Sequence, residues 1–165
     1  MILIRDVRLD DAKSIITILN PIISAGKYSV LVKPLTITEE KVFISNFPEE
    51  GIFHVAERLD DKMVVGFQTI EPFGNYTQAF DHVGVIGTFI DLSMRQKGIG
   101  IILSQSSFQI AKRKGYEKLF TNIRSDNKAA LAFYNKLGFS VIGTARKHAK
   151  IGDRLIDEIF VEKFL

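Results

Sequence analysis

The stretch that decides the fold is VGVIGTFIDLSMRQKGIGIILSQSSFQIAKR, residues 83–113. Its first part, Val83 to Met94, is rich in β-branched and aromatic residues, a composition typical of a buried strand. Two glycines, Gly98 and Gly100, follow at once. Apolar residues beyond this turn recur at helical spacing, at Ile99, Leu103 and Ile110. This order predicts a strand, a glycine-rich turn and a helix.

Such a succession exposes backbone N–H groups at the start of the helix. The first four amides of a helix lack partners within it, and the helix dipole adds about half a positive charge there. Glycines let a phosphate come close, and Arg95 and Lys97 add full charges. The turn therefore predicts a phosphate or pyrophosphate cradle, and the alternative is a turn that only joins a strand to a helix.

Two better-known phosphate-binding patterns do not fit this turn. The dinucleotide fingerprint G-x-G-x-x-G would need a third glycine where Leu103 stands, and it belongs early in a βαβ unit. The Walker pattern G-x-x-x-x-G-K-[ST] occurs nowhere in the chain.

Two motifs together resemble the GNAT superfamily of N-acetyltransferases. Arg95-x-x-Gly98-x-Gly100 is similar to the acetyl-CoA signature Q/R-x-x-G-x-G/A. Residues 127–139, NKAALAFYNKLGF, follow the family's order of an asparagine, a helix with a tyrosine, a glycine and an aromatic residue. The resemblance covers the chain from Val83 onward. The ending at residues 151–160 is similar to that of phosphinothricin, amino-acid and ribosomal-protein acetyltransferases.

The resemblance implies roles for particular residues. The backbones of Ile90 and Leu92 would grip the pantetheine arm and polarise the thioester carbonyl, and the amides of residues 96–101 would hold the pyrophosphate. Tyr134 would be the acid that protonates the coenzyme A sulfur. The other residues implied to contact acetyl-CoA are Arg95, Gln96, Lys97, Gly98, Ile99, Gly100, Ile101, Asn127, Ala130 and Phe133.

Two of these residues also have a purely structural interpretation. Tyr134 lies on the apolar stripe of its helix, where a packing residue is also expected. Asn127 is well placed to cap that helix. No general base can be named, because the glutamate that many relatives carry in the central strand aligns with Val85. The candidates near it in sequence are Asp91, Glu71 and His82.

Composition excludes several classes of function. The chain has 165 residues, a net charge of +3 and no cysteine, so disulfides, thiolate metal sites and a thiol nucleophile are absent. The net charge is too small, and the basic residues are too scattered, to predict nucleic-acid binding. No apolar run reaches the length of a membrane span, and a cytoplasmic location is the expectation.

The remaining pattern predicts one α/β domain over residues 1–165. Strands are expected at 1–7, 52–59, 63–73, 116–124, 141–145 and 155–164. Further helices are expected from Asp11 to Ala25, bent or divided by Pro21, from Thr36 to Pro48, and from Asn127 to Gly138. The resemblance implies a mixed, mostly antiparallel sheet of about seven strands with helices on both faces.

The leading hypothesis is an acetyl-CoA-dependent N-acetyltransferase that acts by direct transfer in a ternary complex. The acceptor would be a small amine or amino-acid-like molecule, and the alternatives are a protein N-terminal or lysine acetyltransferase, or a coenzyme A-binding module without turnover. Substrate choice is expected to lie with the loop around Tyr28 and the loop at Gly152. The pair Asp157-Glu158 could attract an ammonium group, with one of the two merely solvated. A homodimer is a further expectation from the resemblance.

Overall fold

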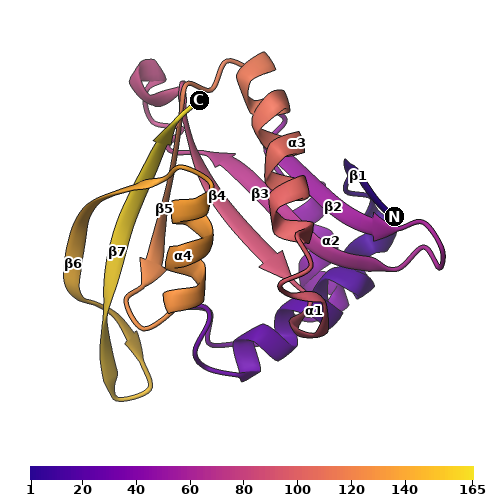
Figure 1. The fold of residues 1–165 in the computed structure, drawn as a ribbon, viewed down its shortest axis with the longest axis horizontal. Coiled ribbons are helices and arrows are strands. Elements are labelled where there is room, and N and C mark those ends of the chain that lie inside the picture. Colours follow the sequence, from indigo (N-terminus) through magenta and orange to yellow (C-terminus); the bar gives the residue numbers. More distant parts are fainter.

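Seven strands form one sheet in the order β1-β2-β3-β4-β5-β7-β6 in the computed structural model, which describes residues 1–165 (Figure 1). All neighbouring pairs are antiparallel except β4 and β5, which are parallel. The strands are β1 (Ile2–Asp6), β2 (Ile52–Arg58), β3 (Val64–Pro72), β4 (Val83–Ile90), β5 (Lys118–Arg124), β6 (Ser140–Ile151) and β7 (Arg154–Phe164). The predicted mixed, mostly antiparallel sheet is confirmed.

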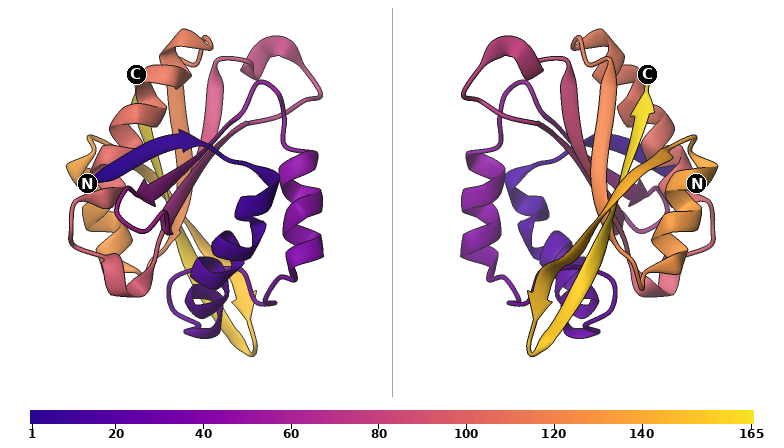
Figure 2. Two further views of the ribbon diagram at one scale, coloured as in Figure 1. Left: turned by 90° about the vertical axis from the view of Figure 1, so that its right-hand side faces the viewer. Right: turned by 90° about the vertical axis from the view of Figure 1, so that its left-hand side faces the viewer.

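Four helices cover this sheet from both sides (Figure 2). They are α1 (Ala12–Ser24), α2 (Ile37–Ser45), α3 (Ile99–Arg113) and α4 (Lys128–Lys136). Side chains alternate across a strand, so Phe53, Val55 and Phe67 pack toward α1, whereas Ile70 and Ile86 pack with α3 and α4 on the other face. Helices on both faces were predicted and are confirmed.

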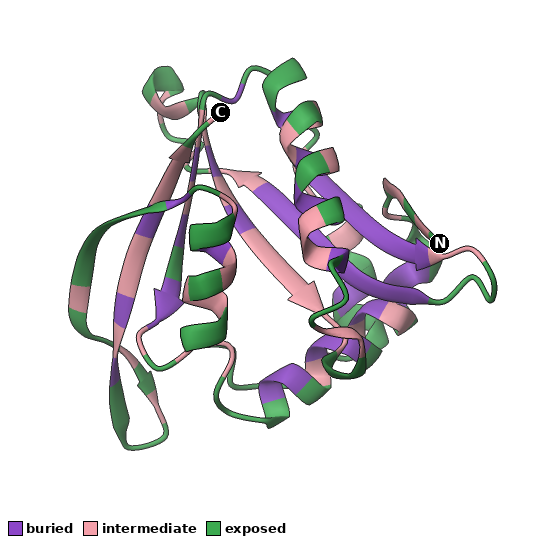
Figure 3. Ribbon diagram, in the orientation of Figure 1, coloured by how far each residue is buried: buried purple, intermediate pink, exposed green.

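How far each strand is buried depends on its place in the sheet and on how the helices cover it (Figure 3). Strands β2 and β3 are buried along nearly their whole length because helices cover both of their faces. Strand β6 lies at the edge of the sheet and is mostly exposed. No helix combines the length and the apolar character needed to cross a bilayer.

The central feature is the place where β4 and β5 separate. The two strands pair only from Val83 with Lys118 to Val85 with Phe120, although β4 stays paired with β3 as far as Ile90. The N–H of Asp91 donates to the Val65 carbonyl at 3.0 Å, so the alternation of the ladder turns the backbone groups of Ile90 toward the gap. The last residues of β4 therefore have no strand beside this edge, and only the Ile90 carbonyl has a partner there, Nε of Arg95 at 3.4 Å.

Three sequence expectations need correction. The strand predicted to reach Met94 ends at Ile90, because the Asp91 carboxylate accepts from the Ser93 amide at 2.8 Å and starts a 3₁₀ turn over Leu92–Met94. Helix α1 runs on through Pro21 without division. Its buried stripe on both sides of the proline outweighs the usual cost of about 3 kcal/mol. Strand β6 is longer than expected, since β7 pairs with it as far as Ile151.

Helix α3 is held to the sheet by side chains such as Leu103, which is fully buried. We expect Leu103→Ala to lower the free energy of unfolding by about 3 kcal/mol, because a cavity remains where the side chain packed. Thermal denaturation should show a fall in Tm of roughly 6–12 °C. Ile102→Ala, on the exposed side of the same helix, is the control and should change Tm far less. Equal losses in both variants would contradict this packing.

Candidate active site

A cavity of about 1400 Å³ lies where β4 and β5 separate. It is lined from both faces of the sheet, by Thr69 and Glu71 on the side of α1 and α2 and by Ile86 and Tyr134 on the side of α3 and α4. The loop between α1 and α2, residues 25–36, closes one end of it through Tyr28 and its neighbours. The cavity therefore passes through the sheet.

The turn before α3 presents unpaired amides to this cavity. None of the backbone N–H groups of residues 95–100 donates to an acceptor in the protein, and Gln96 and Gly98 both have positive φ, 62° and 78°. Gln96, Gly98 and Gly100 line the cavity. Such a concentration of free amides at a helix start suits the diphosphate of coenzyme A.

The two glycines of the turn serve different purposes. Gly98 is in the left-handed region, and no atom lies within 4 Å of where its Cβ would stand, so it is required by backbone conformation. A Cβ on Gly100 would lie 2.8 Å from Cε2 of Phe133. The room that Gly100 leaves is thus filled by a ring of α4, and not left open for phosphate as the sequence suggested.

Most of the predicted cofactor-binding residues meet at the cavity. Those that line it are Ile90, Leu92, Arg95, Gln96, Gly98, Ile99, Gly100, Asn127, Ala130, Phe133 and Tyr134. Lys97 and Ile101 do not line it. The Lys97 side chain lies beside the Met94 sulfur, and the Ile101 amide already donates to the Gly98 carbonyl at 3.1 Å.

Three side chains, those of Arg95, Arg124 and Asn127, contact the loop between α1 and α2. The Arg95 guanidinium stacks 4.2 Å from the centre of the Tyr28 ring. Arg124 donates to the carbonyls of Gly26 and Ser29, each at 2.9 Å, and Asn127 donates to the carbonyl of Tyr28 at 3.1 Å. The loop that was predicted to select the substrate is therefore fastened to β5 and to the start of α4.

Asn127 also caps α4, because its side-chain oxygen accepts from the Ala130 amide at 3.1 Å. The capping role expected from the sequence is present, and the same side chain fixes Tyr28 through its amide nitrogen. Both of its hydrogen-bonding atoms are thus engaged within the protein.

Tyr134 is buried and takes part in a polar chain. Its hydroxyl lies 3.1 Å from Oγ1 of Thr88, and that oxygen accepts from Nε2 of Gln68 at 2.8 Å. Thr88 can therefore donate its only proton to Tyr134, which leaves the phenol proton free to point into the cavity. Burial raises the pKa of Tyr134 to about 12, so the phenol keeps its proton at neutral pH. Nothing in the sequence pattern marked Gln68 or Thr88.

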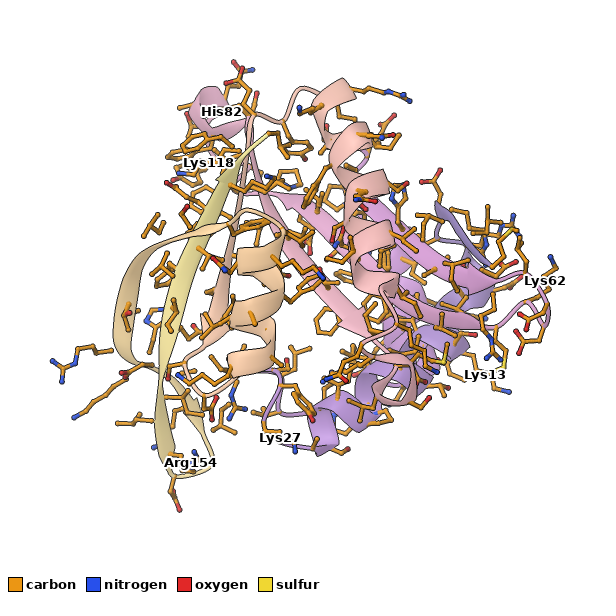
Figure 4. The ribbon with its side chains drawn as sticks, viewed as in Figure 1. Lys13, Lys27, Lys62, His82, Lys118 and Arg154 are labelled. Carbon is orange, nitrogen blue, oxygen red and sulfur yellow. The ribbon has the colours of Figure 1, made fainter.

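The structure distinguishes the three candidate general bases by their positions relative to the cavity. His82 is exposed at the turn before β4, at the periphery of the molecule (Figure 4), and does not line the cavity. Asp91 is occupied by the Ser93 amide and hydroxyl. Glu71 lines the cavity directly across the ladder from Val85 and on the same face. Burial raises its pKa.

Three further carboxylates, Glu39, Glu40 and Glu158, line the cavity, and Glu39 is engaged as the capping residue of α2. Glu158 of β7 is buried and accepts from the Asn122 amide at 2.7 Å, whereas its neighbour Asp157 faces away and accepts from the Lys147 amide. One of the pair thus lies outside the cavity, as expected, but it holds the Lys147 amide and is not merely solvated. Glu40 of α2 was not singled out from the sequence, since acidic residues in the first turn of a helix are common.

The loop at Gly152 was predicted to take part in substrate selection. It joins β6 to β7 at the tip of their hairpin (Figure 1), and it does not line the cavity. The hairpin is long, so the turn projects past the end of the gap. Only Glu158, farther along β7, reaches the cavity from this part of the chain.

The model of the acetyltransferase (GNAT) domain family matches residues 4–160. The chain belongs to the GNAT family. Among curated relatives, YwnH of Bacillus subtilis strain 168, whose name places it among the phosphinothricin acetyltransferases, is 26% identical over 135 residues, which cover 81% of this chain and 80% of YwnH. Membership confirms the predicted acetyltransferase, with acetyl-CoA as the donor.

Solved structures show the same fold. A GNAT superfamily phosphinothricin acetyltransferase from Sinorhizobium meliloti, in complex with acetyl-CoA, superposes with a TM-score of 0.90 at 21% identity, over 99% of this chain and 88% of that one. A ribosomal-protein-alanine N-acetyltransferase from Brucella melitensis has a TM-score of 0.90 at 23% identity, over 99% of both chains.

Glu40 gives a test of the electrostatics of the site. Burial raises its pKa to about 7, above the value of about 4.3 expected in the unfolded chain. The stability that its protonated form contributes is complete at pH values below about 4.3 and is lost as the pH rises through 7. Glu40→Gln should therefore raise Tm over wild type by about 2–4 °C at pH 8, and by much less at pH 5. A difference that does not change with pH would contradict an unpartnered, buried Glu40.

Proposed function

We propose that this GNAT protein transfers the acetyl group of acetyl-CoA directly to a primary amine of a small molecule, with both ligands bound at once. The observation that carries this proposal is the cavity that passes through the sheet. Its lining includes the turn with free amides before α3 and, on the other face of the sheet, residues of α1, α2 and their connecting loop. A donor and an acceptor can therefore enter from opposite faces and meet at the end of β4.

Acetyl-CoA supplies an activated acetyl group on a thioester. The free amides of residues 96–100 bind its diphosphate, and the edge of β4 that β5 leaves open near Ile90 holds the chain that leads to the thioester. In the transfer, a C–N bond forms to the amine and the C–S bond breaks. Tyr134 donates its proton to the leaving sulfur, and Gln68 with Thr88 orients the phenol for this.

Glu71 takes the proton from the amine. It stands beside the position of Val85, where the family's glutamate is missing, so a neighbouring strand supplies the carboxylate that β4 lacks. The Glu71 side chain makes no hydrogen bond or ion pair within the protein, and its raised pKa favours proton uptake nearer to neutral pH.

Two alternative functions remain distinguishable by experiment. A coenzyme A-binding module without turnover is favoured by Val85, and it would bind acetyl-CoA without releasing thiol in the presence of any amine. A protein acceptor is disfavoured by the loop of residues 25–36, which is pinned over the cavity by Arg124 and Asn127. A panel of small amines, followed by free coenzyme A release, separates these functions. A cytoplasmic location and a homodimer stay predictions from the sequence.

Tyr134→Phe tests the acid. It removes the phenol proton and keeps the ring, so kcat should fall by about 100-fold while the Kd for acetyl-CoA stays within about 3-fold of wild type. The measurements are steady-state thiol release and calorimetric titration. Tyr116→Phe is the matched control, because Tyr116 is also buried but donates to the Glu50 carbonyl, away from the cavity. Unchanged turnover in Tyr134→Phe would remove this residue from the acid role.

Glu71→Gln tests the base. We expect kcat to fall by about 100-fold, with the acidic limb of the pH profile lost, since the limb reflects deprotonation of this carboxyl group. Glu117→Gln, at an exposed site outside the cavity, is the control and should match wild type. A variant that keeps the wild-type acidic limb would assign proton removal to another group.

A further inference from the structure

The acceptor side of the cavity is acidic. Glu40, Glu71 and Glu158 come from α2, β3 and β7 and line the same cavity. Glu40 is 2% exposed, and its carboxylate makes no hydrogen bond or ion pair in the protein. Burial of a carboxylate without a partner is costly, so a group that arrives with the ligand is the natural partner for it.

Glu39 shows what a structural carboxylate does in the same helix. Its oxygens accept from the amide and the hydroxyl of Thr36, at 2.8 and 3.0 Å, and complete the capping box of α2. The next residue, Glu40, takes no part in this cap. Its place in the sequence therefore does not explain its burial.

Few basic side chains could meet an anion on this side. The basic residues that line the cavity are Arg95, Arg124 and Lys136. Arg124 donates hydrogen bonds to two loop carbonyls and to both carboxylate oxygens of Asp126, the latter two at 2.9 and 2.8 Å. Arg95 stacks on Tyr28, and Lys136 lies on α4, across the sheet from Glu40. A carboxylate or phosphinate on the acceptor would find a cation only at Arg95, beside Tyr28, and would meet acidic side chains at Glu40 and Glu71.

Apolar side chains surround the acidic groups. Those on the side of α1 and α2 are Leu19, Ile22, Leu35, Phe43 and Phe67. Such walls suit a methylene chain, whereas the carboxylates at Glu40 and Glu71 suit positive charge. The two kinds of surface together match a chain of methylenes with an amine at each end.

We propose that the acceptor is an aliphatic diamine, with one amine presented to Glu71 for acetylation and the other, as an ammonium ion, paired with Glu40. This inference rests on the proposed function and narrows its substrate class. The apolar walls carry the spacer between the two amines. Amino acids are poorer acceptors, because a carboxylate in the place of the second ammonium ion would lie beside Glu40.

The test compares matched acceptors by thiol release at saturating acetyl-CoA. Diamines from 1,3-diaminopropane to 1,6-diaminohexane are each set against the monoamine and the ω-amino acid of equal chain length. We expect the best diamine to exceed its monoamine in kcat/KM by at least about 10-fold and its amino acid by more, as one ion pair in a partly buried site allows. Monoamines or amino acids that match the diamines would overturn the inference and leave the acetyltransferase intact.

Substitution at Glu40 locates the second amine. Glu40→Gln should raise the KM for the best diamine by about 10-fold, with kcat nearly unchanged, and leave the matched monoamine within about 2-fold. Glu49→Gln, an exposed carboxylate of the same charge outside the cavity, is the control. Loss of activity toward both amines alike would overturn the role of Glu40.

A binding experiment keeps the two proposals separate. Calorimetric titration of the diamine into the protein saturated with coenzyme A should show binding that Glu40→Gln weakens by about 10-fold. If no acceptor releases thiol, the proposed function fails, and this titration still decides the inference. The absence of diamine binding there would overturn it.

Discussion

The structure depends on the early separation of two parallel strands. Strand β4 pairs with β5 only as far as Val85, yet it continues to Ile90 against β3. Unpaired backbone groups in a sheet need partners, and here they border a cavity and not a neighbouring strand. The gap is therefore both a break in the sheet and the place where a ligand can supply the missing strand-like contacts. The turn before α3, the tyrosine of α4 and the loop of residues 25–36 are all arranged around it.

The arrangement of charge follows the two faces of this gap. On the face of α3 and α4, free amides and the helix dipole favour an anionic donor. On the face of α1 and α2, Glu40 and Glu71, which have no basic partners, favour a cationic acceptor. Arg124 contributes to this division although it binds no ligand, because it fastens the loop that carries Tyr28 and is itself neutralised by Asp126. In the proposed reaction, the sheet would keep ligands of opposite charge apart until they meet at the end of β4.

The proposed catalytic groups are positioned by packing more than by their own motifs. Tyr134 belongs to the hydrophobic core, and the interpretation of it as a packing residue is correct as far as it goes. Its hydroxyl nevertheless meets Thr88, and the same burial that makes it a core residue keeps its proton in place. Gly100 shows the reverse case, in which a residue assigned to phosphate access makes room for the Phe133 ring.

The sequence by itself determined the order of elements, the family and the turn that holds free amides. These features depend on local spacing, such as the glycines at 98 and 100 and the apolar stripe of α4, and local spacing is readable along the chain. Only the tertiary structure decided that Glu71 stands across from Val85, that Glu40 is buried without a partner, and that the loop at Gly152 lies outside the site. The physical reason is that strand register and the docking of helices bring together residues far apart in sequence, and no periodicity within one segment records those contacts.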